Sequence, residues 1–166
     1  MAILKLNGGY ECLVDDDDYG WISQHTWTAI RTNARRIYVN RKLYKDGKRT
    51  SLFLHRAIMA AVPGELVDHI NNDPFDNRRC NLRICTKSQN NQNRGPNQGK
   101  QYKGVTFSSN LQKYQAWIRC DNKRYFLGTY DTPEAAARAY DLAALEYHQD
   151  FAWLNFPQTL YLPEVS

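Results

Sequence analysis

Residues 66–94 read LVDHINNDPFDNRRCNLRICTKSQNNQNR, and the organisation of the chain is easiest to follow from this stretch. Its two short apolar runs, LVDHI and LRIC, are typical of strands, and the Asn-, Asp- and Pro-rich segment between them is typical of a loop. Thr86 followed by Gln89 matches a capping box, which predicts a helix with Asn90 in its first turns. We therefore expect strand, loop, strand and helix in this order.

Folded back on itself, this stretch is expected to bring Asp68, His69 and Asn90 close together. Histidine is the usual general base near neutral pH. Carboxylate and amide oxygens, such as those of Asp68 and Asn90, are ligands that Mg²⁺ or Mn²⁺ prefers, and a metal held by few protein oxygens keeps positions for phosphate and water. The side-chain amide of Asn81 is suited to hold the loop. Each residue alone has an ordinary structural explanation, but together they favour phosphodiester hydrolysis with Mg²⁺ (or Mn²⁺) as cofactor.

The spacing resembles that of the HNH endonucleases, the ββα-metal fold. Asn81 stands twelve residues after His69, and Asn90 nine residues after that. LHRAIM at 54–59 and the run DNRRCNLRICTKSQNNQN are similar to phage and intron-associated members of the homing type. The resemblance implies His69, Asn81 and Asn90 as catalytic residues, and Asp68 and Asn90 as metal ligands.

Two positions depart from the most familiar form of this motif. Asn90 stands where many members have histidine, which is a known variant. Arg94 stands one helical turn later, where some members have a further histidine; an arginine binds no metal there, and we expect it to contact a phosphate. His55, in LHRAIM, is a candidate second catalytic residue, but we expect it to pack or to contact a phosphate.

Charge favours a polyanionic partner. The length of 166 residues fits one ordinary domain or two small ones. The net charge of +5 and the pI near 9.0 favour a polyanion as partner. No acidic residue lies between Asp76 and Asp121, and residues 31–56 carry many Lys and Arg against Asp46 alone. Basic blocks can be merely solvated surfaces, but two of them beside a nuclease motif predict double-stranded DNA as the partner.

The four cysteines include no CxxC pair, so we expect no structural zinc site, and Cys80 and Cys85 are interpreted as reduced packing residues. We find no signal peptide and no apolar run of membrane length, so we expect no membrane partner and a cytoplasmic, phage- or mobile-element-encoded protein that acts on DNA in the host cell. The carboxylates at 15–18 are expected to form a solvated turn, with Asp18 capping a short helix, rather than a metal site.

The N-terminal region is expected to be rich in strands. ILKL and ECLV are strand candidates, and Asp46-Gly47 between the apolar runs RRIYVNRKL and TSLFLHR predicts a basic hairpin. A short helix is expected over 55–61, before Pro63-Gly64. Residues 95–101 contain Gly and Pro and are expected to be a linker.

Residues 102–157 form a second pattern. YKGVTF, KYQAWIRC and KRYFLGTY predict three strands, and Thr132 followed by Pro133 predicts the start of a helix. The helix is expected to cover one face of the sheet with an apolar stripe comprising Ala136, Ala139, Tyr140, Ala143, Ala144 and Tyr147. Alternation along the strands predicts that four residues point toward the helix, namely Ala116, Ile118, Tyr125 and Leu127. It predicts that four others lie on the open face, namely Trp117, Arg119, Arg124 and Phe126.

KGV, AWIR, FLGTYDTPEAAARAYDLAAL and LNFP resemble the plant ethylene-response-factor, Apetala-two-type DNA-binding domain. This resemblance implies DNA contacts by position from Lys103, Ser108, Arg119, Arg124 and Phe126, and the open face adds Trp117. Plant domains have arginine where Thr106 and Ser108 stand, and glutamate where Trp117 stands, so their target sequence does not carry over. The residues could also be ordinary exposed strand positions.

These observations predict an α+β chain: a β-rich N-terminal region with a ββα-metal HNH nuclease unit, then a three-stranded antiparallel sheet with one packed helix. The expected parts are a nuclease domain (1–94, with the ββα-metal unit at 66–94), a linker (95–101), a DNA-binding domain (102–157) and a tail (158–166). We expect a metal-dependent DNA endonuclease of the homing type, monomeric or homodimeric, that makes a nick or a double-strand break. The alternative is a DNA-binding transcriptional regulator with an inactive nuclease scaffold.

Overall fold

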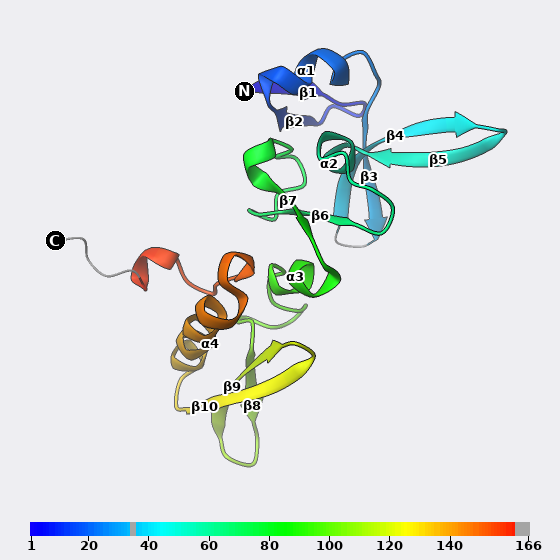
Figure 1. The fold of residues 1–166 in the computed structure, drawn as a ribbon. Coiled ribbons are helices and arrows are strands. Elements are labelled where there is room, and N and C mark those ends of the chain that lie inside the picture. Colours follow the sequence, from blue (N-terminus) through cyan, green and yellow to red (C-terminus); the bar gives the residue numbers. More distant parts are fainter. Residues whose placement is uncertain (34–35, 162–166) are drawn as a thin grey trace. The chain divides into compact units, whose positions relative to one another are not determined.

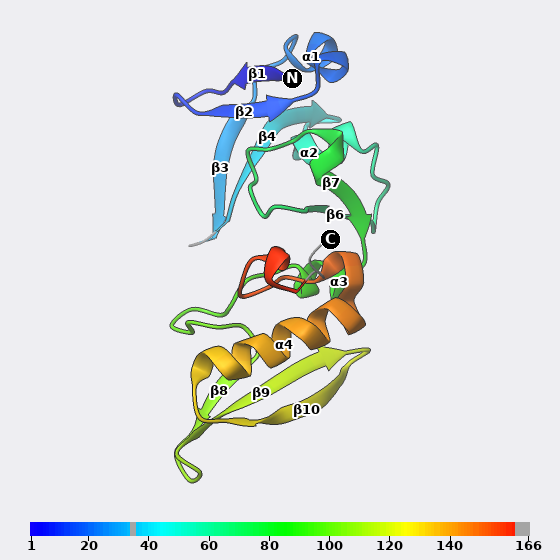
Figure 2. The same cartoon turned by 90° about the vertical axis from the view of Figure 1, so that its left-hand side faces the viewer.

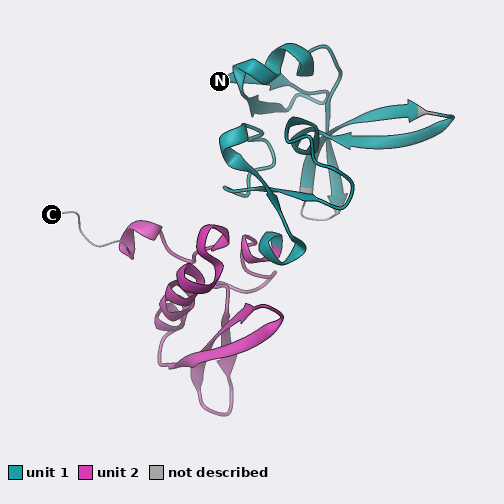
Figure 3. Cartoon of the chain, viewed as in Figure 1, with its two compact units in different colours: residues 1–90 teal, residues 91–166 magenta. Residues whose placement is uncertain are grey.

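The computed structural model describes residues 1–33 and 36–161, and the chain forms two compact units, Met1–Asn90 and Asn91–Ser166 (Figure 3). Each unit combines antiparallel strands with helices, so the expected mixed architecture with antiparallel sheets is confirmed (Figure 1). Position 35 of the expected basic hairpin and residues 162–166 of the expected tail lie outside the described residues. The domain limits and the ββα-metal unit stay predictions.

The first unit contains three small antiparallel sheets, with strand orders β1-β2, β3-β4-β5 and β6-β7. Its strands are β1 (Ala2–Lys5), β2 (Glu11–Val14), β3 (Thr28–Asn33), β4 (Arg36–Lys45), β5 (Lys48–Phe53), β6 (Leu66–His69) and β7 (Leu82–Cys85). Its helices are α1 (Asp16–Ile22), α2 (Leu54–Ile58), the 3-10 helix η1 (Arg79–Asn81) and α3 (Lys87–Gln92), the last of which runs across the division between the units.

The basic hairpin of β4 and β5 confirms the prediction from Asp-Gly. Asp46 and Gly47 have φ angles of 50° and 70°, and Lys45 pairs with Lys48, so the strands are joined by a two-residue turn. Both turn residues therefore adopt the positive φ that the commonest tight hairpin turn requires. The capping box is confirmed as well, because Thr86 N donates to Gln89 Oε1 (2.9 Å) and Gln89 N donates to Thr86 Oγ1 (3.2 Å).

Helix α1 corrects the expected role of Asp18. The helix begins at Asp16, so Asp15 holds the N-cap position. The carboxylate of Asp18 is buried inside the first unit, where it accepts hydrogen bonds from the guanidinium of Arg79 (2.7 and 2.8 Å) and the indole of Trp21 (3.2 Å). A carboxylate engaged by side chains in this way ties α1 to η1 instead of capping a helix.

Two further expectations in the first unit need correction. Helix α2 ends at Ile58, three residues before the expected end, because Ala60 already has a positive φ of 48°. Cys85 is buried as expected, but Cys80 is exposed and therefore does not pack in the core.

The second unit is a three-stranded meander covered on one face by a helix (Figure 2). Its elements are β8 (Val105–Ser108), β9 (Lys113–Cys120), β10 (Lys123–Tyr130), α4 (Pro133–His148), and the 3-10 helices η2 (Gln149–Phe151) and η3 (Gln158–Leu160). Thr132 caps α4 as predicted, accepting a hydrogen bond from the backbone N–H of Ala135 (3.2 Å). No helix among the described residues is long and apolar enough to cross a membrane.

Small residues bring α4 close to the sheet. Ala116 and Ala136 are fully buried between the two layers, and Tyr140 lies directly over the backbone of Gly104. Tyr125 lies on the helix side of the sheet as expected, since it pairs with Ile118 and its ring stacks on Tyr147 of α4 with ring centroids 5.7 Å apart. Both tyrosines lie at the rim, however, and are exposed rather than buried. The amphipathic stripe thus ends one residue further on, at the buried His148, whose Nε2 bonds with Arg119 O (2.9 Å).

Candidate catalytic site and nucleic-acid interface

Asp68 and His69 lie at the C-terminal end of β6, and both side chains are buried. Strand β7 runs antiparallel to β6 and places Arg83 opposite Asp68. Nη2 and Nε of Arg83 donate to Oδ2 of Asp68 at 2.9 and 3.1 Å. A buried carboxylate needs such a partner, because leaving its charge uncompensated costs several kcal/mol, roughly 3 to 5.

Asn81 holds the loop between β6 and β7 through its side chain. Its Nδ2 donates to Oδ1 of Asn71 (2.9 Å) and to the carbonyl of Asp76 (2.8 Å), and its Oδ1 accepts from the backbone N–H of Asn71 (3.0 Å). Arg78 forms two short hydrogen bonds with the buried carboxylate of Asp76, at 2.6 and 2.7 Å. The polar loop is therefore rigidly bonded, although its sequence is typical of flexible turns.

Asn77 orients the ring of His69, and sequence analysis did not identify it. Its side chain is 1% exposed; Nδ2 donates to the carbonyl of Pro74 (3.0 Å), and Oδ1 lies 3.3 Å from His69 Nε2. Its backbone is fixed by β2, since Asn77 N donates to Leu13 O (2.8 Å). Because Nδ2 is committed to Pro74, the oxygen faces His69, so Nε2 carries the proton and Nδ1 holds the lone pair of the neutral ring.

His69 also contacts the ring of His55, which packs among aromatic side chains. The ring centroids of His55 and His69 are 5.1 Å apart, and His55 lies 5.4 Å from Tyr38 and 5.8 Å from Phe53. Burial lowers the pKa of His55 to about 3, so this ring is neutral at pH 7. Of the two roles expected for His55, packing or contact with a phosphate, this buried position among rings is compatible with packing.

Burial also lowers the pKa of His69 below its ordinary value, and the bond with Asn77 and the nearby Asp68 carboxylate oppose that effect. A ring with a lowered pKa is neutral at pH 7 and can accept a proton. His69 thus combines a neutral ring with an orientation held by Asn77, which is compatible with a general base.

Asn90 lies in α3, where its backbone N–H donates to Thr86 O (3.0 Å) and its side chain is half-buried. Among the described residues, no group of three or more His, Cys, Asp or Glu side chains is arranged to hold a metal ion. The donor chemistry fits a hard divalent cation, since carboxylate and amide oxygens are the available ligands, with Arg83 sharing the carboxylate.

In the second unit, four predicted residues occupy the sheet face opposite α4. Arg124 pairs with Arg119 across β9 and β10, and Phe126 pairs with Trp117. The guanidinium of Arg124 lies 4.0 Å from the ring centroid of Trp117, and the rings of Trp117 and Phe126 are 4.8 Å apart. Phe126 is 52% exposed. This exposed combination of arginine and aromatic rings suits contact with DNA bases and phosphates.

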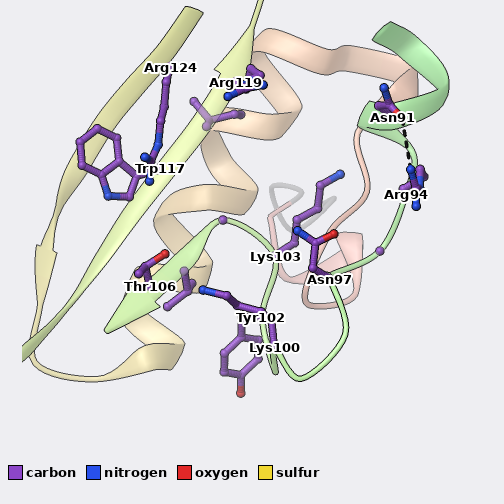
Figure 4. A pocket seen from close by; sticks show the side chains of 14 residues that line it. Asn91, Arg94, Asn97, Lys100, Tyr102, Lys103, Thr106, Trp117, Arg119 and Arg124 are labelled. Atoms are coloured by element: carbon purple, nitrogen blue, oxygen red, sulfur yellow. Dashed lines mark hydrogen bonds between the residues drawn. The ribbon is translucent and has the colours of Figure 1, made fainter. Parts of the chain in front are cut away.

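A pocket of about 490 Å³ opens beside this face (Figure 4). It is lined by Asn91, Arg94, Gly95, Asn97, Lys100, Tyr102, Lys103, Gly104, Val105, Thr106, Trp117, Ile118, Arg119 and Arg124.

The predicted DNA contacts Lys103 and Ser108 are less exposed than the sheet face. Nζ of Lys103 donates to the carbonyl of Gln92 and lies about 6 Å from the rings of Tyr140 and Trp153. Burial, with Arg94 nearby, lowers the pKa of Lys103 to about 8. Ser108 is half-buried at the end of β8 and does not line the pocket, whereas Arg94 is exposed and does.

Comparison with known proteins identifies two families on this chain. Residues 53–92 match the HNH endonuclease family, and residues 100–149 match the AP2 domain. The first match contains β6, β7 and α3, and the second contains the meander and α4.

Similar curated proteins include an AP2-like ethylene-responsive transcription factor of Arabidopsis thaliana, 40% identical over 75 residues that cover 39% of this chain and 18% of that protein. APETALA2-like protein 2 of Oryza sativa subsp. indica is 42% identical over 64 residues, covering 38% of this chain and 15% of that protein. Ethylene-responsive transcription factor ERF010 of Arabidopsis thaliana is 47% identical over 64 residues, covering 36% and 33%. The chain thus spans one third or less of the length of these relatives. It carries an HNH endonuclease domain followed by an AP2 domain.

Proposed function

We propose that this chain is a divalent-metal-dependent DNA endonuclease of the homing type, whose AP2 domain selects the site that the HNH domain cuts. The observation that carries the proposal is His69, which is buried, held in one tautomer by Asn77, and adjacent in sequence to the buried Asp68. Binding of DNA alone requires none of these features. The HNH match over residues 53–92 supports the same reading.

In the proposed mechanism His69 is the general base. With the Nε2 proton bonded to Asn77, Nδ1 takes a proton from a water molecule as the water oxygen attacks phosphorus. The new P–O bond forms as the bond to one sugar oxygen breaks, and that oxygen leaves with a proton from solvent. Asp68 and Asn90 would hold a divalent cation, which when bound stabilises the charge on the phosphate and the departing oxygen. Asn81 keeps the loop, and with it Asn77, in place.

The AP2 domain would supply sequence preference through the open sheet face. Arg119 and Arg124 are proposed to pair with guanine edges or phosphates, and Trp117 and Phe126 to contact thymine methyl groups. Arg124 is already held by stacking on Trp117, so less side-chain freedom is lost when it binds.

Three further predicted contacts are proposed for the DNA backbone rather than for base reading. Arg94 and Lys103 line the basic pocket, and Ser108 lies at the end of β8. Their contacts would hold the domain on DNA of any sequence, because phosphates carry no sequence information.

The oligomeric state determines how many strands are cut: a monomer with one catalytic site would nick the DNA, whereas a homodimer would break both strands.

The test is cleavage of supercoiled plasmid by the full chain with Mg²⁺ or Mn²⁺, with and without chelator. We expect metal-dependent nicking by the wild-type protein and a loss on the order of 10² to 10⁴ in rate for His69→Ala. His25→Ala is the matched control, because His25 is an exposed histidine in the same unit. Equal cleavage by His69→Ala and wild type would show that the mechanism is wrong.

A second function is a DNA-binding regulator that retains an inactive nuclease scaffold. The observation in its favour is that Arg83 already neutralises Asp68, while two of the relatives described above are ethylene-responsive transcription factors by name. The same plasmid assay separates the two functions. A protein that retards DNA but leaves the plasmid supercoiled with every divalent metal tested would be a regulator.

A further inference from the structure

The pocket of the second unit carries an excess of positive charge. Five of the residues that line it are cationic, and none is Asp or Glu; the cationic residues are Arg94, Lys100, Lys103, Arg119 and Arg124. Figure 4 shows side chains of Arg119, Arg124 and Lys103 around the same space. Several like charges gathered in one cavity repel one another, so the cavity favours an anionic ligand.

One wall of this pocket comes from residues that precede the AP2 match. Asn91, Arg94 and Asn97 line the pocket, whereas the match begins at residue 100. Part of this stretch lies in the linker that the sequence predicted over 95–101, where Gly95 and Asn97 line the pocket. A Cβ on Gly95 would lie 3.3 Å from the ring of Trp153, and the carbonyl of Gln92 accepts the hydrogen bond of Lys103.

The opposite wall is the edge of the DNA-facing sheet, since Trp117, Arg119 and Arg124 line the pocket from β9 and β10. A DNA strand lying on this face therefore passes the mouth of the pocket. The volume of about 490 Å³ is within the usual range of ligand pockets, but the lining is polar and basic rather than apolar. Phosphate and sugar, not a hydrophobic ligand, match such a lining.

We propose that this pocket receives the phosphodiester backbone of the DNA that the sheet contacts, and that the segment 91–100 is therefore part of the DNA interface. The inference rests on the proposed function only in its assumption that the second unit binds DNA. Arg94 and Lys100 neutralise backbone phosphates without reading bases, so they fix the position of the strand while Arg119 and Arg124 contact it at the sheet.

The experiment measures binding without cleavage. The full chain carrying His69→Ala is titrated in chelator against a fluorescent target duplex and a scrambled duplex, over a series of salt concentrations. Arg94→Gln and Lys100→Gln should each weaken binding to both duplexes equally and flatten the slope of log affinity against log salt by roughly 1. Arg138→Gln is the control, because Arg138 is exposed on α4, where its guanidinium lies over Phe156, and the substitution removes the same charge.

Three results would overturn the inference. The first is a salt slope that Arg94→Gln and Lys100→Gln change no more than Arg138→Gln does. The second is a loss confined to the target duplex, which would mean base reading. The third is displacement of the duplex by a mononucleotide at matched ionic strength, which would mean a free-nucleotide site. Failure of the nuclease proposal looks different, because it leaves these binding results unchanged and abolishes only metal-dependent cleavage.

Discussion

Replacement of Lys103 by methionine tests how the basic pocket is built. Nζ of Lys103 is largely removed from water, donates to the carbonyl of Gln92, and lies near the guanidinium of Arg94. Burial and Arg94 lower the pKa of Lys103 from 10.5 to about 8, while Asp141 opposes the shift. The folded protein thus holds a charged group in a position that disfavours the charge.

The magnitude follows from the shift. The pKa difference between 10.5 and about 8 means that folding with Lys103 protonated costs about 3 kcal/mol more than folding with Lys103 neutral. Because the folded pKa lies below the unfolded one, the unfolded chain binds more protons between these values, and stability rises with pH there. The penalty is complete below pH 8 and absent above pH 10.5. Lys103→Met removes the titrating group and should show no such rise.

The assay is urea unfolding of both proteins at pH 7 and at about pH 10.5, followed by tryptophan fluorescence, since Trp153 lies near Lys103. The quantity compared is the difference in unfolding free energy between the wild type and Lys103→Met. Neighbouring groups such as Tyr140 and His148 occur in both proteins, so their titration largely cancels in this difference. We expect the wild type to gain about 3 kcal/mol relative to the variant as pH rises. A difference that stays constant across this range would refute the argument that Lys103 is buried in charged form.

Two further substitutions test packing and orientation. Gly104→Ala places a Cβ 1.9 Å from Tyr140 Cδ2 at a φ of +79°, so we expect thermal unfolding to show a loss of about 3 kcal/mol or more in the free energy of unfolding. The control Gly99→Ala has a similar φ of +76° but no atom within 4 Å, and should cost only about 1 kcal/mol. Equal losses in the two variants would show that backbone strain alone is involved. Asn77→Leu removes the acceptor that fixes the His69 ring, so we expect plasmid cleavage to fall on the order of 10²-fold while DNA binding is unchanged; wild-type cleavage would mean that another contact sets the tautomer.

Local signals in the sequence predicted local structure well. The capping box at Thr86, the Asp46-Gly47 turn and the Thr132 cap all formed as expected, because each depends on residues within a few positions of one another. Asp18 was the exception among local signals. Its carboxylate is taken by Arg79, 61 residues later in the chain, and no local pattern reveals such a partner.

The parts of the candidate site that depend on tertiary packing were not predictable in this way. Asn77 is one of several asparagines in the loop, and only its position beside Leu13 and Pro74 distinguishes it. Residues 95–101 were predicted to be a linker from their Gly and Pro content, which describes backbone propensity and says nothing about packing against Trp153. Composition gave the correct sign of charge, but only the fold shows which cations share one cavity.

The two candidate sites differ in how their charge is balanced. In the first unit the buried Asp68 is already neutralised by Arg83, so a cation that takes this carboxylate as ligand gains little from unbalanced buried charge. In the second unit the pocket gathers cations, and no carboxylate lines it. Of these two sites, the pocket is thus the one that offers a polyanion unbalanced positive charge.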